Sequence, residues 1–214
     1  MNSLVLCGKL KYMEKVFDKI RRRKTRLLAE QNFLINDGCD RDPRTTSEDR
    51  IVGDQNGLRG RSFVYGKYPA SHNACEAIAV HNAKVLLGKP SKLSSTIAEF
   101  QNLHAMIFSG FFGSNVFRIG RVLKKEGIPF KRIFRKRRLK FPGLYIVSFW
   151  NEKPLKNGIH TVAVRYDNVK YETYNLWGNG RVSEESPLSY GKRFIIGYRL
   201  GDGGIGGTDE KKSV

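Results

Sequence analysis

The chain has 214 residues, which is the length of one domain with an extension. Its 39 Lys and Arg residues outnumber its 20 Asp and Glu residues, so the formal net charge is +19. With 40% hydrophobic and 11% aromatic residues the chain can build a core, which excludes disorder throughout. No apolar run approaches the ~18 residues of a membrane-spanning helix.

The N-terminal segment, residues 1–61, is predicted to be a basic helix followed by a polar linker. Apolar residues recur with a helical period over residues 10–35, and we expect this helix to lie outside the main fold. The polar, Gly-containing residues 36–62 are typical of a linker. We expect a globular domain over residues 62–200 and a disordered Gly-rich tail over residues 201–214.

Within the domain, the predicted helices precede the predicted strands. Helices are expected over residues 74–87, from 94 or 95 to 106, and from Ser114, as the N-cap, to just before Gly127. Strands are expected over residues 129–134, 143–149, 159–166, 169–176 and 193–200. This order predicts an α+β fold in which three helices pack on an antiparallel sheet.

The positive charge is concentrated between residues 61 and 150, which contain 16 basic and 3 acidic residues. One basic cluster spans residues 21–26 and a second spans residues 131–140. A basic surface suits an anionic partner such as nucleic acid, but it can also be merely solvated. We interpret both clusters as lacking the interleaved aromatic residues of a base-stacking platform.

The cysteines, Cys7, Cys39 and Cys75, are odd in number and widely spaced. This argues against a disulfide framework and against a paired CxxC zinc site. A metal site made of His72, Cys75 and His81 fits no familiar ligand spacing. We therefore expect no metal, no cofactor and a cytoplasmic protein with free thiols.

Cys75 is predicted to be the second residue, in the first turn, of the helix over residues 74–87. Asn73 is a good N-cap, and Glu76 three residues later resembles a capping box. There the free backbone N–H groups and the positive end of the helix dipole lower a thiol pKa. An isolated cysteine can equally be a small apolar residue beneath a helix.

His160 is predicted to open the first strand of a hairpin over residues 159–176, with Asp167 and Asn168 as a two-residue turn. In this register His160 faces Asn175, with their Cβ atoms about 5 Å apart. A carboxamide placed there can fix the tautomer and orientation of an imidazole, which is the third-residue role in a Cys-His-Asn triad.

The order Cys75, His160, Asn175 resembles that of the papain-like cysteine peptidases. Asn-Leu-Trp-Gly at residues 175–178 resembles the papain family's Asn-Ser-Trp-Gly. The resemblance implies that Trp177 shields the Asn–His hydrogen bond from water.

A closer similarity is to the C39-like branch, named for bacteriocin-processing peptidases. Gly-Ile-His-Thr-Val-Ala-Val at residues 158–164 is similar to that branch's Gly-His-x-Val-Val, displaced by one residue. The turn over residues 109–114 and the helix that follows are also similar, and the resemblance covers residues 62–200. It implies a bacterial protein with a papain-like fold, a helical half packed on an antiparallel sheet.

The chain departs from the C39-like pattern at the oxyanion hole. These enzymes usually carry a glutamine six residues before the cysteine, where this chain has Pro69. They also tend to have Asp-Cys-Gly, where this chain has Ala-Cys-Glu at residues 74–76. The backbone N–H of Cys75 can supply one oxyanion donor, and Asn73 or His72 another.

The resemblance implies a cysteine peptidase, or a related thiol acyl-transfer hydrolase, with Cys75 as nucleophile and His160 as base. The expected substrate is a peptide or protein, and the basic surface suits an acidic one. The alternative is a catalytically degenerate papain-like module that binds nucleic acid or another polyanion through its basic face. A zinc protein is a third possibility.

Overall fold

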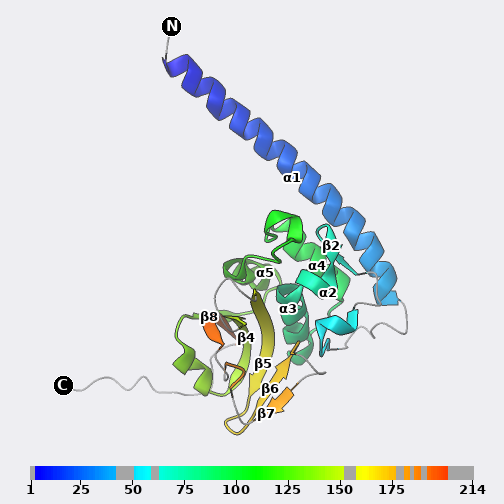
Figure 1. Ribbon diagram of the computed structural model, residues 1–214, viewed down its shortest axis with the longest axis vertical. Helices are drawn as coiled ribbons and strands as arrows, with labels where there is room; N and C mark the ends of the chain where they lie inside the picture. Colours follow the sequence, from blue (N-terminus) through cyan, green and yellow to red (C-terminus); the bar gives the residue numbers. More distant parts are fainter. Residues whose placement is uncertain are drawn as a thin grey trace, which may run out of the picture.

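The fold is α+β, with helices packed against an antiparallel sheet, as the sequence predicts (Figure 1). The structure is a computed structural model, and it describes residues 3–41, 51–58, 63–151, 158–176, 181–183, 186–188 and 192–201. The predicted tail from residue 202 onward and Trp177 lie outside the described residues.

The main sheet has six strands in the order β3-β8-β4-β5-β6-β7, and all of its neighbouring strands are antiparallel. Its strands are β3 (Phe130–Ile133), β4 (Gly143–Trp150), β5 (Ile159–Tyr166), β6 (Tyr171–Tyr174), β7 (Arg181–Ser183) and β8 (Arg193–Leu200). The predicted strands correspond to β3, β4, β5, β6 and β8, whereas β7 was not predicted. A small hairpin of β1 (Val64–Tyr65) and β2 (Tyr68–Pro69) was not predicted either.

The predicted helices are present, with shifted ends. The α-helices are α1 (Ser3–Arg41), α2 (Ala70–Asn73), α3 (Cys75–Leu86), α4 (Leu93–Asn102) and α5 (Ile119–Lys125). The 3-10 helices are η1 (Gln55–Leu58), η2 (Phe108–Gly110), η3 (Val116–Arg118) and η4 (Lys136–Lys140). The predicted cap Ser114 is wrong, because Asn115 caps η3 with its side chain.

Helix α3 lies against β4 and β5, and it is buried on all sides over residues 75–84. Alanines at 77, 79 and 83 leave room for close packing, and a helix without an exposed face belongs in a core. Two apolar clusters result, one between the sheet and the helices and one on the opposite face. Alternate residues of β4 enter the two clusters, Ile146 the first and Val147 the second.

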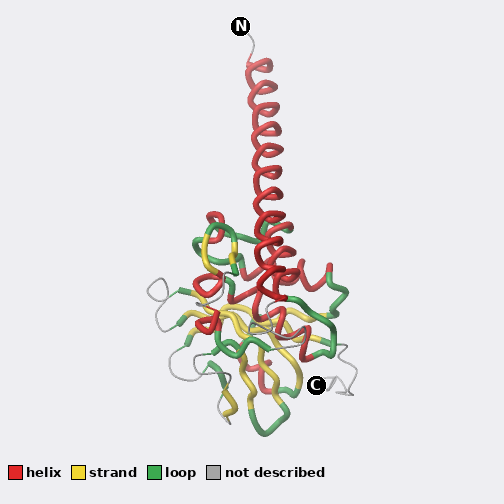
Figure 2. Tube along the Cα trace, turned by 90° about the vertical axis from the view of Figure 1, so that its right-hand side faces the viewer, coloured by secondary structure: helices red, strands yellow, loops and turns green. Residues whose placement is uncertain are grey.

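The C-terminal part of α1 packs on the domain, so the prediction that this helix lies outside the main fold is wrong for that part. The Asn32 side chain donates to the Gly66 carbonyl and to Gln101 Oε1, both at 2.7 Å. The N-terminal part of α1 extends away from the rest of the chain (Figures 1 and 2). None of the described helices has the length and apolar character needed to cross a lipid bilayer.

The predicted linker also contributes to the core. Val52 is buried, and its N–H and carbonyl pair with the side chain of Asn82 on α3 at 2.8 and 2.9 Å. The boundary predicted at residue 62 therefore separates segments that pack together. The apolar periodicity predicted the helix α1 but not the surface on which α1 packs, because that surface is formed by residues distant in the sequence.

Asn32→Ala is expected to lower the free energy of unfolding by about 1–3 kcal/mol, because it removes the amide that donates to two buried acceptors. Urea unfolding monitored by circular dichroism measures the change. The neighbouring exposed residue supplies the control, Gln31→Ala, which should change the value by less than about 0.5 kcal/mol. Equal effects of the two substitutions would contradict this docking of α1.

The predicted register of the β5–β6 hairpin is wrong. Tyr166 pairs with Tyr171, so the loop contains four residues, 167–170, rather than two. The carboxylate of Asp167 accepts from the N–H groups of Val169 and Lys170, both at 2.9 Å, and this closes the longer turn. His160 therefore does not face Asn175 across the ladder.

Candidate active site

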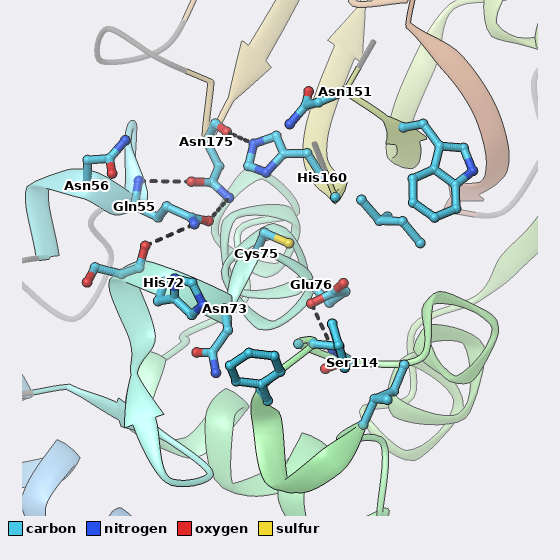
Figure 3. A pocket seen from close by; sticks show the side chains of 18 of the residues that line it. Gln55, Asn56, His72, Asn73, Cys75, Glu76, Ser114, Asn151, His160 and Asn175 are labelled. Atoms are coloured by element: carbon cyan, nitrogen blue, oxygen red, sulfur yellow. Dashed lines mark hydrogen bonds between the residues drawn. The ribbon is translucent and has the colours of Figure 1, made fainter. Parts of the chain in front are cut away.

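A cleft of about 770 Å³ lies between the helical half and one end of the sheet. Its helical wall includes Cys75 and Glu76, and its sheet wall includes His160 and Asn175. Figure 3 shows Cys75 at the end of α3, between the imidazole of His160 and the carboxyl group of Glu76. The structure thus brings the three predicted catalytic residues into one cleft.

Cys75 lies in the first turn of α3, as predicted, but it is the first residue of the helix rather than the second, because the cap is different. Ala74 occupies the N-cap position and makes no side-chain hydrogen bond. Asn73 instead ends α2, its amide donates to the carbonyl of Gly110, and its Oδ1 has no hydrogen-bond partner among the described residues. The prediction of Asn73 as N-cap is therefore wrong, although Asn73 does line the cleft.

Burial raises the pKa of the Cys75 thiol well above its usual value, and the negative charge of Glu76 raises it further. Hydrogen bonds from Thr161 act in the opposite direction and are outweighed. The predicted lowering of this pKa at the helix N-terminus is wrong. Cys75 is only 6% exposed, and the loss of hydration of a thiolate at that burial exceeds the attraction of a helix end.

Glu76 is a functional candidate that sequence reasoning treated only as a capping residue. The residue is 2% exposed, and its carboxyl group accepts from the N–H of Ser114 at 3.3 Å and hydrogen-bonds to the Cys75 thiol. Burial raises its pKa to about 7. The signal available in the sequence was a single charged residue within the otherwise uncharged stretch from Ala74 to Val80.

Gly113 permits the close approach of the loop that bonds Glu76. This glycine has a φ of +68°, and a Cβ atom there would lie 3.0 Å from the carbonyl oxygen of Asn73 and 3.2 Å from Glu76 Oε2. Any side chain would push the loop away from α3. The glycine therefore keeps the N–H of Ser114 within reach of the carboxylate.

His160 is held by the backbone of Asn175 rather than by its side chain. Nε2 of the imidazole lies 2.5 Å from the carbonyl oxygen of Asn175. A carbonyl oxygen only accepts, so Nε2 carries the proton and Nδ1 is the free basic nitrogen. The predicted contact between the carboxamide and the imidazole is wrong, but Asn175 still orients the ring through a different atom.

Burial lowers the pKa of His160, and the positive charge of Lys192 lowers it further. The carbonyl of Asn175 and the charge of Asp54 act in the opposite direction without reversing the shift. The thiol of Cys75 bonds to Thr161 and Glu76 rather than to the imidazole. The two groups are therefore both neutral near pH 7, a thiol beside an imidazole.

Gln55 is a second residue that the sequence analysis missed. The side chain of Asn175 accepts from the Gln55 backbone N–H at 2.9 Å and donates to its Oε1 at 3.3 Å. Gln55 Nε2 donates to the carbonyl of Ser71 at 3.0 Å, and Gln55 lines the cleft. Pro69, at the position where the C39-like pattern expects glutamine, lies exposed in β2. No local pattern marked Gln55, because it lies in the predicted linker.

No protein-family model matches the chain, and no curated protein matches it. The fold and the site together define an α+β protein whose cleft combines a buried thiol, an imidazole and a protonatable carboxyl group. Its function is therefore inferred from the chemistry of those groups.

Proposed function

We propose that the chain is a papain-like thiol hydrolase of the C39-like type that cleaves peptide bonds. The observation that carries the proposal is the cleft shared by Cys75 and His160, in which the carbonyl of Asn175 holds the imidazole with Nδ1 free. A thiol and an imidazole oriented by a third group are the parts of a Cys-His nucleophilic site.

In the proposed reaction, Sγ of Cys75 bonds to the substrate carbonyl carbon while the thiol proton moves to Nδ1 of His160. The C–N bond then breaks, the leaving amine takes that proton, and a thioester remains. Water attacks the thioester, His160 accepts a proton from the water, and the proton returns to the Cys75 sulfur as the acid leaves. Because the resting pair is neutral, the proton moves during the attack rather than before it.

Gln55 is the residue best placed to stabilise the oxyanion. One N–H of its amide donates to Ser71, and the other remains for a ligand in the cleft. The backbone N–H of Cys75, in the first turn of α3, supplies a second donor. Loss of one such donor typically lowers a rate by about 10²–10³-fold.

The substrate proposed is a peptide or a protein segment. Phe111 and Phe112 line the cleft with rings that are 46% and 64% exposed, which suits an apolar side chain of a bound peptide. The net charge of +19 favours an acidic substrate by attracting it over the whole surface.

Cys75→Ala is expected to abolish cleavage of a proteome-derived peptide library followed by mass spectrometry. The reason is that no other side chain of the site can form the thioester. Cys39→Ala is the matched control, because this half-buried cysteine lies on α1 outside the cleft, and the variant should cleave the library like the wild type. Cleavage that persists in Cys75→Ala would show that Cys75 is not the nucleophile. A wild type that cleaves no peptide of the library would overturn the peptidase proposal.

A further inference from the structure

A second surface, outside the cleft, is formed by β3, η4 and the residues that join them. It carries seven basic side chains, all exposed: Lys131, Arg132, Arg135, Lys136, Arg137, Arg138 and Lys140. Residues 130–142 include no acidic residue. In the part of the chain that the structure describes, none of the seven is paired with a carboxylate. The charge of this basic surface is therefore available to an anionic ligand.

Two aromatic rings lie among these charges, contrary to the interpretation from the sequence. Phe134 is 65% exposed and Phe141 is 49% exposed. Both line a pocket of about 300 Å³ together with Lys131, Arg132, Ile133, Arg135, Arg138 and Arg199. Exposed rings beside unpaired cations have no role in the core, because their apolar faces remain in contact with water.

The basic surface is fixed to the domain. Leu139 and Ile133 are buried in the second apolar cluster, beneath the exposed cations. Tyr145 donates its hydroxyl to the carbonyl of Phe141 at 2.5 Å, and Lys136 donates to the carbonyl of Leu188 at 3.2 Å. Because the backbone is held in this way, a ligand would not have to order it on binding.

We infer that the basic surface binds single-stranded nucleic acid, with phosphates on its Lys and Arg side chains and bases stacked on Phe134 and Phe141. Binding sites for single strands combine cations along the phosphate backbone of the nucleic acid with aromatic rings that can stack on any base. A duplex keeps its base faces covered, and an acidic polypeptide has no flat rings in series, so the exposed phenylalanines favour the single strand.

The basic surface is separate from the cleft. The pocket that Phe134 and Phe141 line shares no lining residue with the cleft. Strand β3 lies at the edge of the sheet, and β8 separates it from β4, whose last residue, Trp150, lines the cleft. The inference therefore does not rest on the proposed peptidase activity, and each can fail without the other.

Fluorescence anisotropy with a labelled oligouridylate of about 15 nucleotides tests the inference. With four phosphate contacts, affinity should fall roughly 50-fold between about 50 and about 200 mM salt. Arg135→Gln/Arg138→Gln should lower the slope of the logarithmic salt plot by about 1.4, because two phosphate contacts are lost. Arg22→Gln/Arg23→Gln on α1 removes the same charge elsewhere and should leave the slope unchanged.

Phe134→Leu tests the stacking without a change of charge. It should weaken oligouridylate binding by about 5-fold or more at low salt and leave the binding of polyglutamate unchanged. Equal binding of polyglutamate and oligouridylate, with no effect of Phe134→Leu, would overturn the inference in favour of nonspecific attraction. Absence of oligouridylate binding at about 50 mM salt would also overturn it. All substituted side chains are exposed, and thermal melting checks that the fold is retained.

Discussion

Replacing His160 with alanine is expected to lower kcat for peptide cleavage by about 10²–10⁴-fold, the contribution of a positioned proton acceptor. The pKa of the Cys75 thiol is raised by burial, so the thiol cannot ionise unaided near neutral pH. The measurement uses the library peptide that the wild type cleaves most readily. His104→Ala, which changes an exposed histidine outside the cleft, is the control and should keep the wild-type kcat.

A second variant, Asn175→Gly, distinguishes the two ways in which Asn175 can hold the imidazole, through its backbone carbonyl or through its side chain. Glycine keeps the carbonyl that accepts from His160 Nε2 and tolerates the φ of +68° at this position. The bonds lost are those of the side chain to Gln55 and to the carbonyl of Thr161, and none of them reaches the imidazole. We therefore expect kcat to fall by at most about tenfold. A loss as large as that of His160→Ala would show that the carboxamide orients the imidazole.

Glu76→Gln is expected to stabilise the protein at pH 8 by up to about 3 kcal/mol, and to have little effect near pH 4.5. The ordinary pKa of a glutamate is 4.5, whereas burial raises that of Glu76 to about 7. Between these values the folded chain retains a proton that the unfolded chain has released. Stability is therefore lost as the pH rises from 4.5 to 7, and the loss is complete above the folded pKa.

Urea unfolding of the wild type and of Glu76→Gln at pH 5 and pH 8 measures this difference, since all other titrating groups are common to both. Glu172→Gln, on β6 and paired with Arg165 at 3.8 Å, is the control and should show a difference below about 1 kcal/mol. Iodoacetamide should also alkylate Cys75 faster in Glu76→Gln, because a neighbouring negative charge is removed. A variant that is less stable than the wild type at pH 8 would contradict the raised pKa.

The regular elements could be predicted because each depends on residues that are close in the sequence. The strand over residues 159–166 and the strand over residues 193–200 have the predicted bounds, and α3 differs from its prediction by one residue at each end. Period-two and helical patterns are complete within such windows. The position of Cys75 at the start of a helix followed from the same local signals.

The hairpin register was decided by the turn. Asp167 draws the N–H groups of Val169 and Lys170 to its carboxylate, and the four-residue loop moves Tyr171 opposite Tyr166. This signal was present in the sequence, but a two-residue turn was equally compatible with the alternation of the strands. The difference moved the contact with His160 from a side chain of Asn175 to its backbone.

By itself, the sequence determined the α+β class, the order of the α-helices before the strands of the main sheet, and the cysteine and histidine that line the same cleft. Only the tertiary structure decided that α1 docks on the domain, that Gln55 enters the cleft, and that Cys75 and Glu76 are buried side by side. Local patterning follows from backbone geometry over a few residues. Burial, and the pKa of a buried group, depend on the loss of water to segments distant in the chain, which no local pattern contains.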